Sequence, residues 1–281
     1  MKRAPVLRWI LLASVVLAAQ ATPATRAATC VLWNRMESAA NVLNSEIGPD
    51  GTVHGSSDAY EPAQFGNGYV RKAVGDYVSF PGSVLTGLTQ RGTVEMWINP
   101  KVTAPQPYAY GIFGFVGACY EHYGVPSSDI ALSWGDGVTG QGFMGNISFG
   151  GVVSANTPPE AAQFYATPGV PFHVAMCWDI AGIDGTADTI RVYRDGGVVG
   201  ATSDAWDSSA SPTRDITLGY GADSGGYDKF ITDNIKLWDA ALTDYSHRFD
   251  EAYPVPEPVT SLPVLGALGA LGGYVRRRFA A

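Results

Sequence analysis

The hydrophobic residues between positions 22 and 253 fall into short runs separated by glycine, proline and serine, with no long helical period. The clearest runs are rich in β-branched and aromatic residues and lie at 93–98 (TVEMWI), 172–178 (FHVAMCW), 189–193 (TIRVY), 215–220 (DITLGY) and 234–238 (NIKLW). Such residues favour strands, and several of the runs alternate apolar with polar positions. The pattern predicts many short strands that form one large β-sandwich.

A β-hairpin is predicted around Asp195 and Gly196. These residues follow the alternating run at 189–193 and precede a second apolar run at 198–202. An Asp-Gly pair suits the tight turn between two antiparallel strands, because both residues tolerate a positive φ.

The N-terminal residues 1–21 have the pattern of a secretory signal peptide. Three basic residues, Lys2, Arg3 and Arg8, precede an apolar run at 9–19, and small side chains occupy positions 19 and 21. Signal peptidase reads small residues at these two positions. We expect cleavage after Ala21, with a later cut near Ala27 as the alternative.

The C-terminal residues 254–281 combine a proline-rich motif, a weakly apolar run at 259–275 and a basic cluster. The motif is Val255, Pro256, Glu257 and Pro258, and the cluster is Arg276, Arg277 and Arg278. As a helix the run would span about 25 Å, just short of a hydrocarbon core of about 30 Å, and the arginines should stay cytoplasmic. The segment resembles the PEP-CTERM sorting signal of bacterial exported proteins. The resemblance implies transient inner-membrane anchoring and processing by an exosortase, a transpeptidase-like membrane protein; an ordinary single-span anchor is the alternative.

The domain between these two segments is strongly acidic. Six of the 18 lysine and arginine residues lie outside residues 22–258, whereas all 26 aspartate and glutamate residues lie within them, so residues 22–258 have a net charge of −14. Such a domain repels nucleic acid and anionic lipid headgroups. It is suited to remain soluble outside the cell.

The chain has three cysteines: Cys30, Cys119 and Cys177. An odd number in an oxidising compartment allows at most one intramolecular disulfide, and the sequence leaves its pairing open. Because Cys177 lies within an apolar run, we interpret it as a small buried hydrophobic residue. The four histidines do not have the spacing of zinc ligands.

Motifs that follow one another along the chain resemble those of the laminin G-like, or concanavalin A-like, domain. They are FGNGYVRKA and DYVSFP within 65–81, TVEMWINP at 93–100, HVAMCWD at 173–179, RVYRDG at 191–196 and FITDNIKLWDAALT at 230–243. Pro171 and Phe172 depart from the pattern, because the family has a tryptophan before the histidine. The resemblance covers about residues 31–250 and implies an antiparallel, two-sheet jelly-roll sandwich. We expect Trp97, Trp178 and Trp238 on its inner faces.

The same resemblance implies a calcium site. In the family an aspartate at the start of the closing strand, here Asp233, can meet a carboxylate from the N-terminal segment and backbone carbonyls. Calcium takes about six to eight oxygen ligands, so one aspartate is not enough. The upstream partner is Glu37, Asp50 or Asp58, and the sequence does not rank them. A simpler alternative is that Asp233 merely ends a strand.

A glycan-binding surface is predicted from aromatic residues in segments rich in glycine, proline and serine. Aromatic rings stack on the apolar faces of sugars, and loops often carry binding residues. The candidates are Tyr108, Tyr110, Tyr120, His122, Tyr123 and Trp134. Packing of these loops by their own tyrosines is the alternative.

No motif for catalysis is present in the sequence. A retaining glycosidase needs two adjacent carboxylates, whereas Glu95 has no acidic partner at two or five residues. A serine nucleophile elbow, a phosphate loop and an HExxH helix are also missing. The chain is therefore expected not to be an enzyme.

Together these features predict an exported, non-catalytic protein of the cell surface or extracellular matrix that binds glycan or exopolysaccharide. Its expected partners are signal peptidase, an exosortase and matrix polysaccharide, and its expected cofactor is calcium. The alternatives are a structural matrix or biofilm protein without a specific ligand, and a polysaccharide hydrolase or lyase of the same fold.

Overall fold

The computed structural model describes residues 27–56, 59–73, 75–101, 113–117, 130–134, 143–149, 155–156, 166–212, 214–218 and 230–252. Its strands are β1 (Cys30–Asn34), β2 (Thr52–His54), β3 (Ala59–Pro62), β4 (Asn67–Val70), β5 (Tyr77–Phe80), β6 (Arg91–Pro100), β7 (Phe113–Gly117), β8 (Ile130–Trp134), β9 (Phe143–Ile147), β10 (Ala155–Asn156), β11 (Phe172–Asp179), β12 (Ile190–Arg194), β13 (Gly197–Thr202), β14 (Ile216–Leu218) and β15 (Phe230–Trp238). The short helix α1 (Ala39–Val42) and the 3₁₀ turns η1 (Gly82–Gly87), η3 (Ile183–Gly185) and η4 (Ser246–Phe249) connect them. The predicted mostly β architecture is confirmed.

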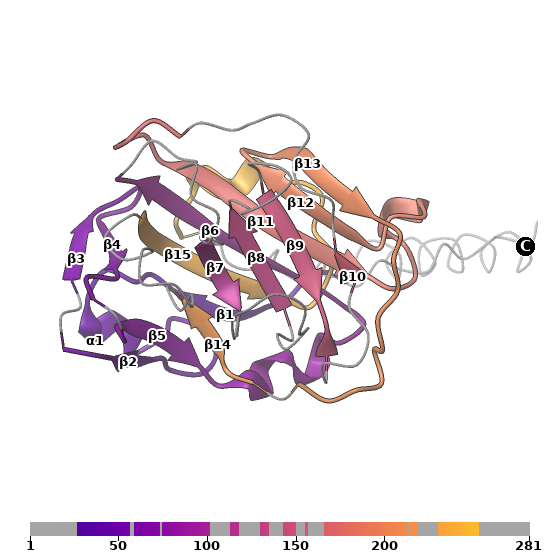
Figure 1. The fold of residues 1–281 in the computed structure, drawn as a ribbon, viewed down its shortest axis with the longest axis horizontal. Coiled ribbons are helices and arrows are strands. Elements are labelled where there is room, and N and C mark those ends of the chain that lie inside the picture. Colours follow the sequence, from indigo (N-terminus) through magenta and orange to yellow (C-terminus); the bar gives the residue numbers. More distant parts are fainter. Residues whose placement is uncertain are drawn as a thin grey trace, which may run out of the picture.

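The strands form antiparallel sheets in two layers. Within the described residues, the large sheet has the order β13-β12-β11-β6-β15-β4-β3, and β1 also pairs with β15. A sheet of order β10-β9-β8-β7 and a second of order β14-β5-β2 make the other layer, and Figure 1 shows β7, β8 and β9 lying across the large sheet. Side chains from all three sheets share one hydrophobic core.

The alternation of residues along the central strands assigns their side chains to the two faces of the large sheet. In β6, Val94, Met96 and Ile98 enter the core between the layers. Because successive strand residues point to opposite faces, Glu95 and Trp97 face the other way. We call the face toward the second layer the inner face and the opposite one the outer face.

The predicted hairpin is confirmed. β12 and β13 are antiparallel neighbours, with Arg194 opposite Gly197. Asp195 has a φ of 51° and Gly196 a φ of 85°. Both central residues of the turn therefore have the left-handed conformation that this type of hairpin requires.

The three strand tryptophans do not share one location, so part of the prediction for them is wrong. Trp178 lies in the inter-layer core, where its Nε1 donates a hydrogen bond of 2.7 Å to the carbonyl of Leu88. Trp97 and Trp238 are also buried, with 4% and 1% exposure, but they lie on the outer face. The physical reason is strand parity, since their neighbours Met96 and Leu237 occupy the inner face.

The outer face is covered by residues 239–252, which follow β15 and which we call the strap. Tyr245 of the strap is buried in a small cluster with Ala175, Cys177, Ile183 and Tyr193. A further cluster joins Trp238 to β1. The centre of the large sheet is therefore buried on both faces.

Residues 1–26 and 253–281, which contain the predicted signal peptide and sorting segment, lie outside the described residues. In the part of the chain that the structure describes, no helix is long and apolar enough to cross a membrane.

Candidate functional site

The candidate glycan-binding residues fall largely outside the described part of the chain. Trp134 is the last residue of β8. The other candidates lie outside the described residues: Tyr108, Tyr110, Tyr120, His122 and Tyr123. The glycan-binding surface therefore stays a prediction.

Asp233, the predicted calcium ligand, is a buried carboxylate within β15. Its side chain is 1% exposed, and its Oδ2 accepts a hydrogen bond of 2.8 Å from the backbone N–H of Phe65. Its Oδ1 is buried without a hydrogen-bond partner. Burial, followed by the negative charges of Glu251 and Glu37, raises the pKa of Asp233 to about 8. An ionised Asp233 would be stabilised here by a cation.

Glu37 and Asp50 differ in their relation to Asp233. Glu37 acts electrostatically on Asp233, and its Oε1 lies so close to Gly66 that a Cβ on that glycine would come within 2.9 Å of it. Asp50 is exposed and accepts a hydrogen bond of 2.9 Å from the backbone N–H of Ser45. Asp58, the third upstream partner considered, lies outside the described residues.

The carboxylates of Asp233 and Glu37 fit the start of a calcium site. Carboxylate oxygens are preferred calcium ligands, and Oδ1 of Asp233 is buried without a hydrogen-bond partner. Among the described residues, no three histidine, cysteine, aspartate or glutamate side chains converge to hold a metal ion. Asp233 and Glu37 would hold the ion, which would supply positive charge to a buried carboxylate. Backbone carbonyls would have to complete its coordination.

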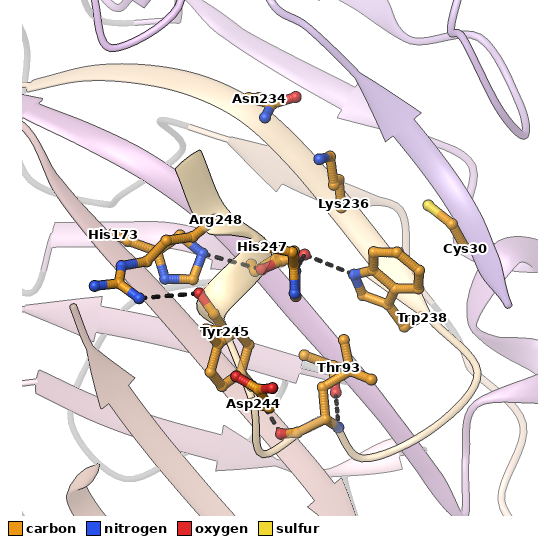
Figure 2. Close-up of polar contacts among 12 residues, drawn as sticks. Cys30, Thr93, His173, Asn234, Lys236, Trp238, Asp244, Tyr245, His247 and Arg248 are labelled. Carbon is orange, nitrogen blue, oxygen red and sulfur yellow. Dashed lines mark hydrogen bonds and ion pairs between the residues drawn. The ribbon is translucent and has the colours of Figure 1, made fainter. Parts of the chain in front are cut away.

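A second polar site lies on the outer face, where three side chains donate to the carboxylate of Glu95. Nε2 of His173 lies 3.0 Å from Oε2, Nε2 of His247 lies 3.1 Å from Oε1, and Nε1 of Trp238 lies 2.8 Å from Oε1. Figure 2 shows the side chains of His173, His247 and Trp238 pointing toward one another from β11, the strap and β15. We call these four residues the Glu95 cluster.

The Glu95 cluster is buried, and its electrostatics favour the ionised carboxylate. Glu95 and His173 are each 2% exposed. Burial alone would raise the pKa of Glu95, but hydrogen bonds and positive charge from His173 and His247 outweigh it and hold that pKa well below its usual range. Burial lowers the pKa of the nearby Lys236, and the charge of Glu95 opposes this shift.

Sequence reasoning missed this cluster, because its members are far apart in the chain. His173 is 78 residues and His247 is 152 residues from Glu95. The available signal was strand register, since antiparallel pairing places Ala175 opposite Glu95 and His173 opposite Trp97. The position of His247 in the strap could not be read from any periodicity.

The cluster holds the strap rather than presenting reactive groups to solvent. Both oxygens of Glu95 are occupied by donors from the protein.

The two described cysteines, Cys30 and Cys177, are free and buried. Burial raises the pKa of each thiol to about 12, so both remain protonated near neutral pH and are poor nucleophiles.

Comparison with known proteins agrees with the fold. The profile of the family Laminin_G_3, described as the concanavalin A-like lectin/glucanases superfamily, matches residues 72–245, more than half of the chain. The chain therefore belongs to this family, and the resemblance drawn from the sequence motifs is confirmed. A search of curated proteins gave no match.

Solved structures of similar fold include domain 4 of an extracellular arabinanase from Geobacillus stearothermophilus, in complex with arabinotriose. It has a TM-score of 0.54 and 17% identity over 81% of this chain and 100% of that domain. A second is a structure of botulinum neurotoxin type C, whose cell entry depends on interaction with two ganglioside molecules. It has a TM-score of 0.54 and 11% identity over 80% of this chain and 52% of the toxin chain. Trypanosoma rangeli sialidase with a covalent intermediate has a TM-score of 0.50 and 14% identity over 76% of this chain and 31% of its own. At these identities the likeness shows the fold.

Proposed function

We propose that this protein is an exported, non-catalytic glycan-binding protein of the concanavalin A-like family. The family match over residues 72–245 carries this proposal. Support comes from the arabinanase domain, which the chain covers completely and whose structure contains arabinotriose. The ligand class is therefore a polysaccharide of the cell surface or extracellular matrix.

The location of the protein rests on its two terminal segments. The charge asymmetry and apolar run of residues 1–21 favour export, and the motif at 255–258 with the arginines at 276–278 favours sorting by an exosortase. Replacing Pro256, Glu257 and Pro258 by alanine should leave a longer, membrane-retained species. Unchanged size and location would instead support a simple anchor.

Binding is tested by applying the purified protein to a glycan array and to the exopolysaccharide of its own host. We expect retention that is lost in Tyr120→Ala and Tyr123→Ala at an unchanged melting temperature. Phe249→Ala is the matched control, because this aromatic side chain is 61% exposed on the strap. A folded protein that binds no glycan would support the alternative of a structural matrix protein.

The non-catalytic assignment is tested by incubation with the same polysaccharides. The occupied oxygens of Glu95 support it, because a catalytic carboxylate must reach the substrate. We expect no new reducing ends. Release of reducing ends by the wild type, with loss in Glu95→Gln, would support a hydrolase.

We also propose that calcium binds at Asp233 and Glu37. The support is the buried Oδ1 of Asp233 and its electrostatic interaction with Glu37. A ligand of the folded state raises the melting temperature by mass action, so removal of calcium by EDTA should lower it. Asp233→Ala should lose this response, whereas Asp50→Ala, at an exposed position, should keep it. An identical EDTA response in wild type and Asp233→Ala would contradict the proposal.

A further inference from the structure

Phe249 of the strap is the most exposed large apolar side chain among the described residues. It lies in η4 and is 61% exposed. The centroid of its ring lies 5.5 Å from that of Trp97 and 4.5 Å from the guanidinium carbon of Arg248. A single exposed apolar side chain is common on a protein surface, so its meaning depends on its neighbours.

The strap fixes Phe249 on the outer face through contacts on both sides of it in the chain. Tyr245 is buried in the outer-face cluster. Nε1 of Trp97 donates a hydrogen bond of 3.0 Å to the carbonyl of Arg248, and Nζ of Lys236 donates one of 3.2 Å to the carbonyl of Glu251. The exposed ring of Phe249 therefore belongs to an ordered part of the fold.

A second exposed apolar side chain, Val198, lies on the same face. Val198 is 53% exposed and is paired with Tyr193, which belongs to the outer-face cluster. Residues directly opposite each other on paired strands share a face. The β12–β13 turn also approaches the strap, because a Cβ on Gly196 would lie 3.2 Å from Nη1 of Arg248. We call Val198, Arg248 and Phe249 the strap-end patch.

The strap-end patch is close to the point where the chain leaves the domain. The described strap ends at Ala252, and the apolar run of the C-terminal segment begins at Val259. Seven residue steps span at most about 25 Å. While the run lies in a bilayer, the patch is tethered near the membrane surface, and tethering makes a weak contact effective. This step rests on the location proposed above for the C-terminal segment.

The charge around the patch selects the kind of membrane surface. Asp244 and Asp250 of the strap are exposed, Glu251 follows them, and residues 22–258 have a net charge of −14. Such a surface is repelled by anionic headgroups and by a second copy of itself. A surface of zwitterionic lipid carries no net charge to oppose the contact, and exposed phenylalanine is favourable at the boundary between headgroups and acyl chains.

We propose that the strap-end patch contacts the surface of the zwitterionic bilayer that holds the C-terminal segment. The outer face of the large sheet then lies toward the membrane. The second layer, which includes β8, lies on the opposite side of the large sheet (Figure 1) and faces away from the membrane. The contact therefore orients the domain with its second layer toward extracellular polysaccharide.

Photolabelling of the full-length protein in vesicles tests this contact. The vesicles consist of phosphatidylcholine and contain a photoactivatable phosphatidylcholine whose reactive group lies near the glycerol backbone; labelled sites are mapped by peptide. We expect label in the apolar run at 259–275 and in the peptides that contain Phe249 and Val198. The peptide with Leu43 should stay unlabelled, because α1, which Leu43 follows, lies at the opposite end of the molecule from β13 (Figure 1).

The apolar run at 259–275 is the internal reference, which separates this proposal from the one on location. Label in the run but not in the strap would overturn the membrane contact alone. Label in neither would overturn both proposals. If the strap stays unlabelled and the detergent-solubilised protein sediments as a dimer that Phe249→Ala dissociates, the patch belongs to a second copy of the chain.

Variants separate lipid contact from mere proximity. Phe249→Ala should lower the strap label about tenfold relative to the label in the run, because it removes the apolar surface that the bilayer covers. Phe249→Trp should keep the label, since tryptophan is favourable at the membrane interface. Leu43→Ala is the matched control, because Leu43 is 55% exposed, and it should behave as wild type.

Lipid charge gives a readout that a purely structural role of Phe249 would not move. Added phosphatidylglycerol should lower the label in the strap but not in the run, and high salt should restore it by screening. Unchanged strap label in Phe249→Ala, or equal strap label in both lipids at low salt, would overturn the proposal. The wild-type map in phosphatidylcholine decides the matter even if a variant fails to fold.

Discussion

The two faces of the large sheet are buried to a similar extent but by different means. The inner face carries residues such as Val94, Met96 and Leu237, which pack against the second layer. The outer face carries Glu95 and His173, which are equally inaccessible to solvent. Apolar packing is non-directional, whereas a buried polar network needs each donor and acceptor to be paired.

Because of this difference, substitutions on the two faces should destabilise the protein in different ways. Truncation on the inner face leaves a cavity whose cost depends on how well neighbours collapse. Truncation on the outer face leaves donors or charges without partners, and its cost depends on protonation. Stability measured against pH should therefore distinguish them.

The largest effect is expected for Trp178→Ala on the inner face. It removes a fully buried indole and its hydrogen bond to Leu88. We expect a loss of about 4 kcal/mol in the free energy of unfolding, independent of pH between about 5 and 8. Urea unfolding at several pH values measures it. A loss below about 1 kcal/mol would show that the inner face repacks easily.

Glu95→Ala should destabilise the outer face by about 3 kcal/mol, because it removes the buried carboxylate that accepts hydrogen bonds from His173, His247 and Trp238. Glu95→Gln should cost less, since one amide oxygen still accepts. Hydrogen exchange should show the loss of protection concentrated in the strap. Equal loss throughout both layers would contradict the separation of the two faces.

Asp233→Asn should alter the pH dependence of stability in calcium-free protein. The raised pKa of about 8, against an ordinary value of 3.8, means that folded Asp233 keeps a proton that the unfolded chain has lost. This residue therefore makes stability fall as the pH rises from about 4 to about 8. The asparagine variant should reduce that slope in urea titrations. A wild-type slope in the variant would show that Asp233 is ionised in the fold.

The smallest effect is expected at the β12–β13 turn. Gly196 has a φ of 85°, and a Cβ there would lie 3.2 Å from Nη1 of Arg248. Gly196→Ala should therefore cost about 1 kcal/mol. Thermal unfolding measures the cost, and Gly197→Ala is the control, since its Cβ would meet only the carbonyl oxygen of Arg194 at 3.6 Å. Equal costs at both positions would exclude the φ as the cause.

Much of the strand layout could be predicted from local sequence. The runs at 93–98 and 172–178 fall within β6 and β11, and the Asp-Gly turn forms the expected hairpin. These features depend on side-chain shape and on a period of two, which act between near neighbours. Membership of the family could also be predicted from the sequence, because the family's motifs include several of these strands.

The face that each tryptophan occupies depended on register, and here the sequence-based expectation was wrong for Trp97 and Trp238. A strand buried on both faces gives no apolar–polar contrast to show which side is inner. β6 shows this, since its residues are buried from Gly92 to Ile98 on either face. The sequence shows that successive residues alternate between two faces, but it does not show which of these faces is the inner one.

The sequence by itself determined the mostly β, antiparallel architecture and the family, because both are carried by local motifs. Tertiary structure alone decided that Glu95, His173 and His247 meet under the strap. Their hydrogen bonds join residues up to 152 positions apart. Such contacts exist only after the chain has closed on itself, because the donors and acceptors are brought together by packing and not by local preference.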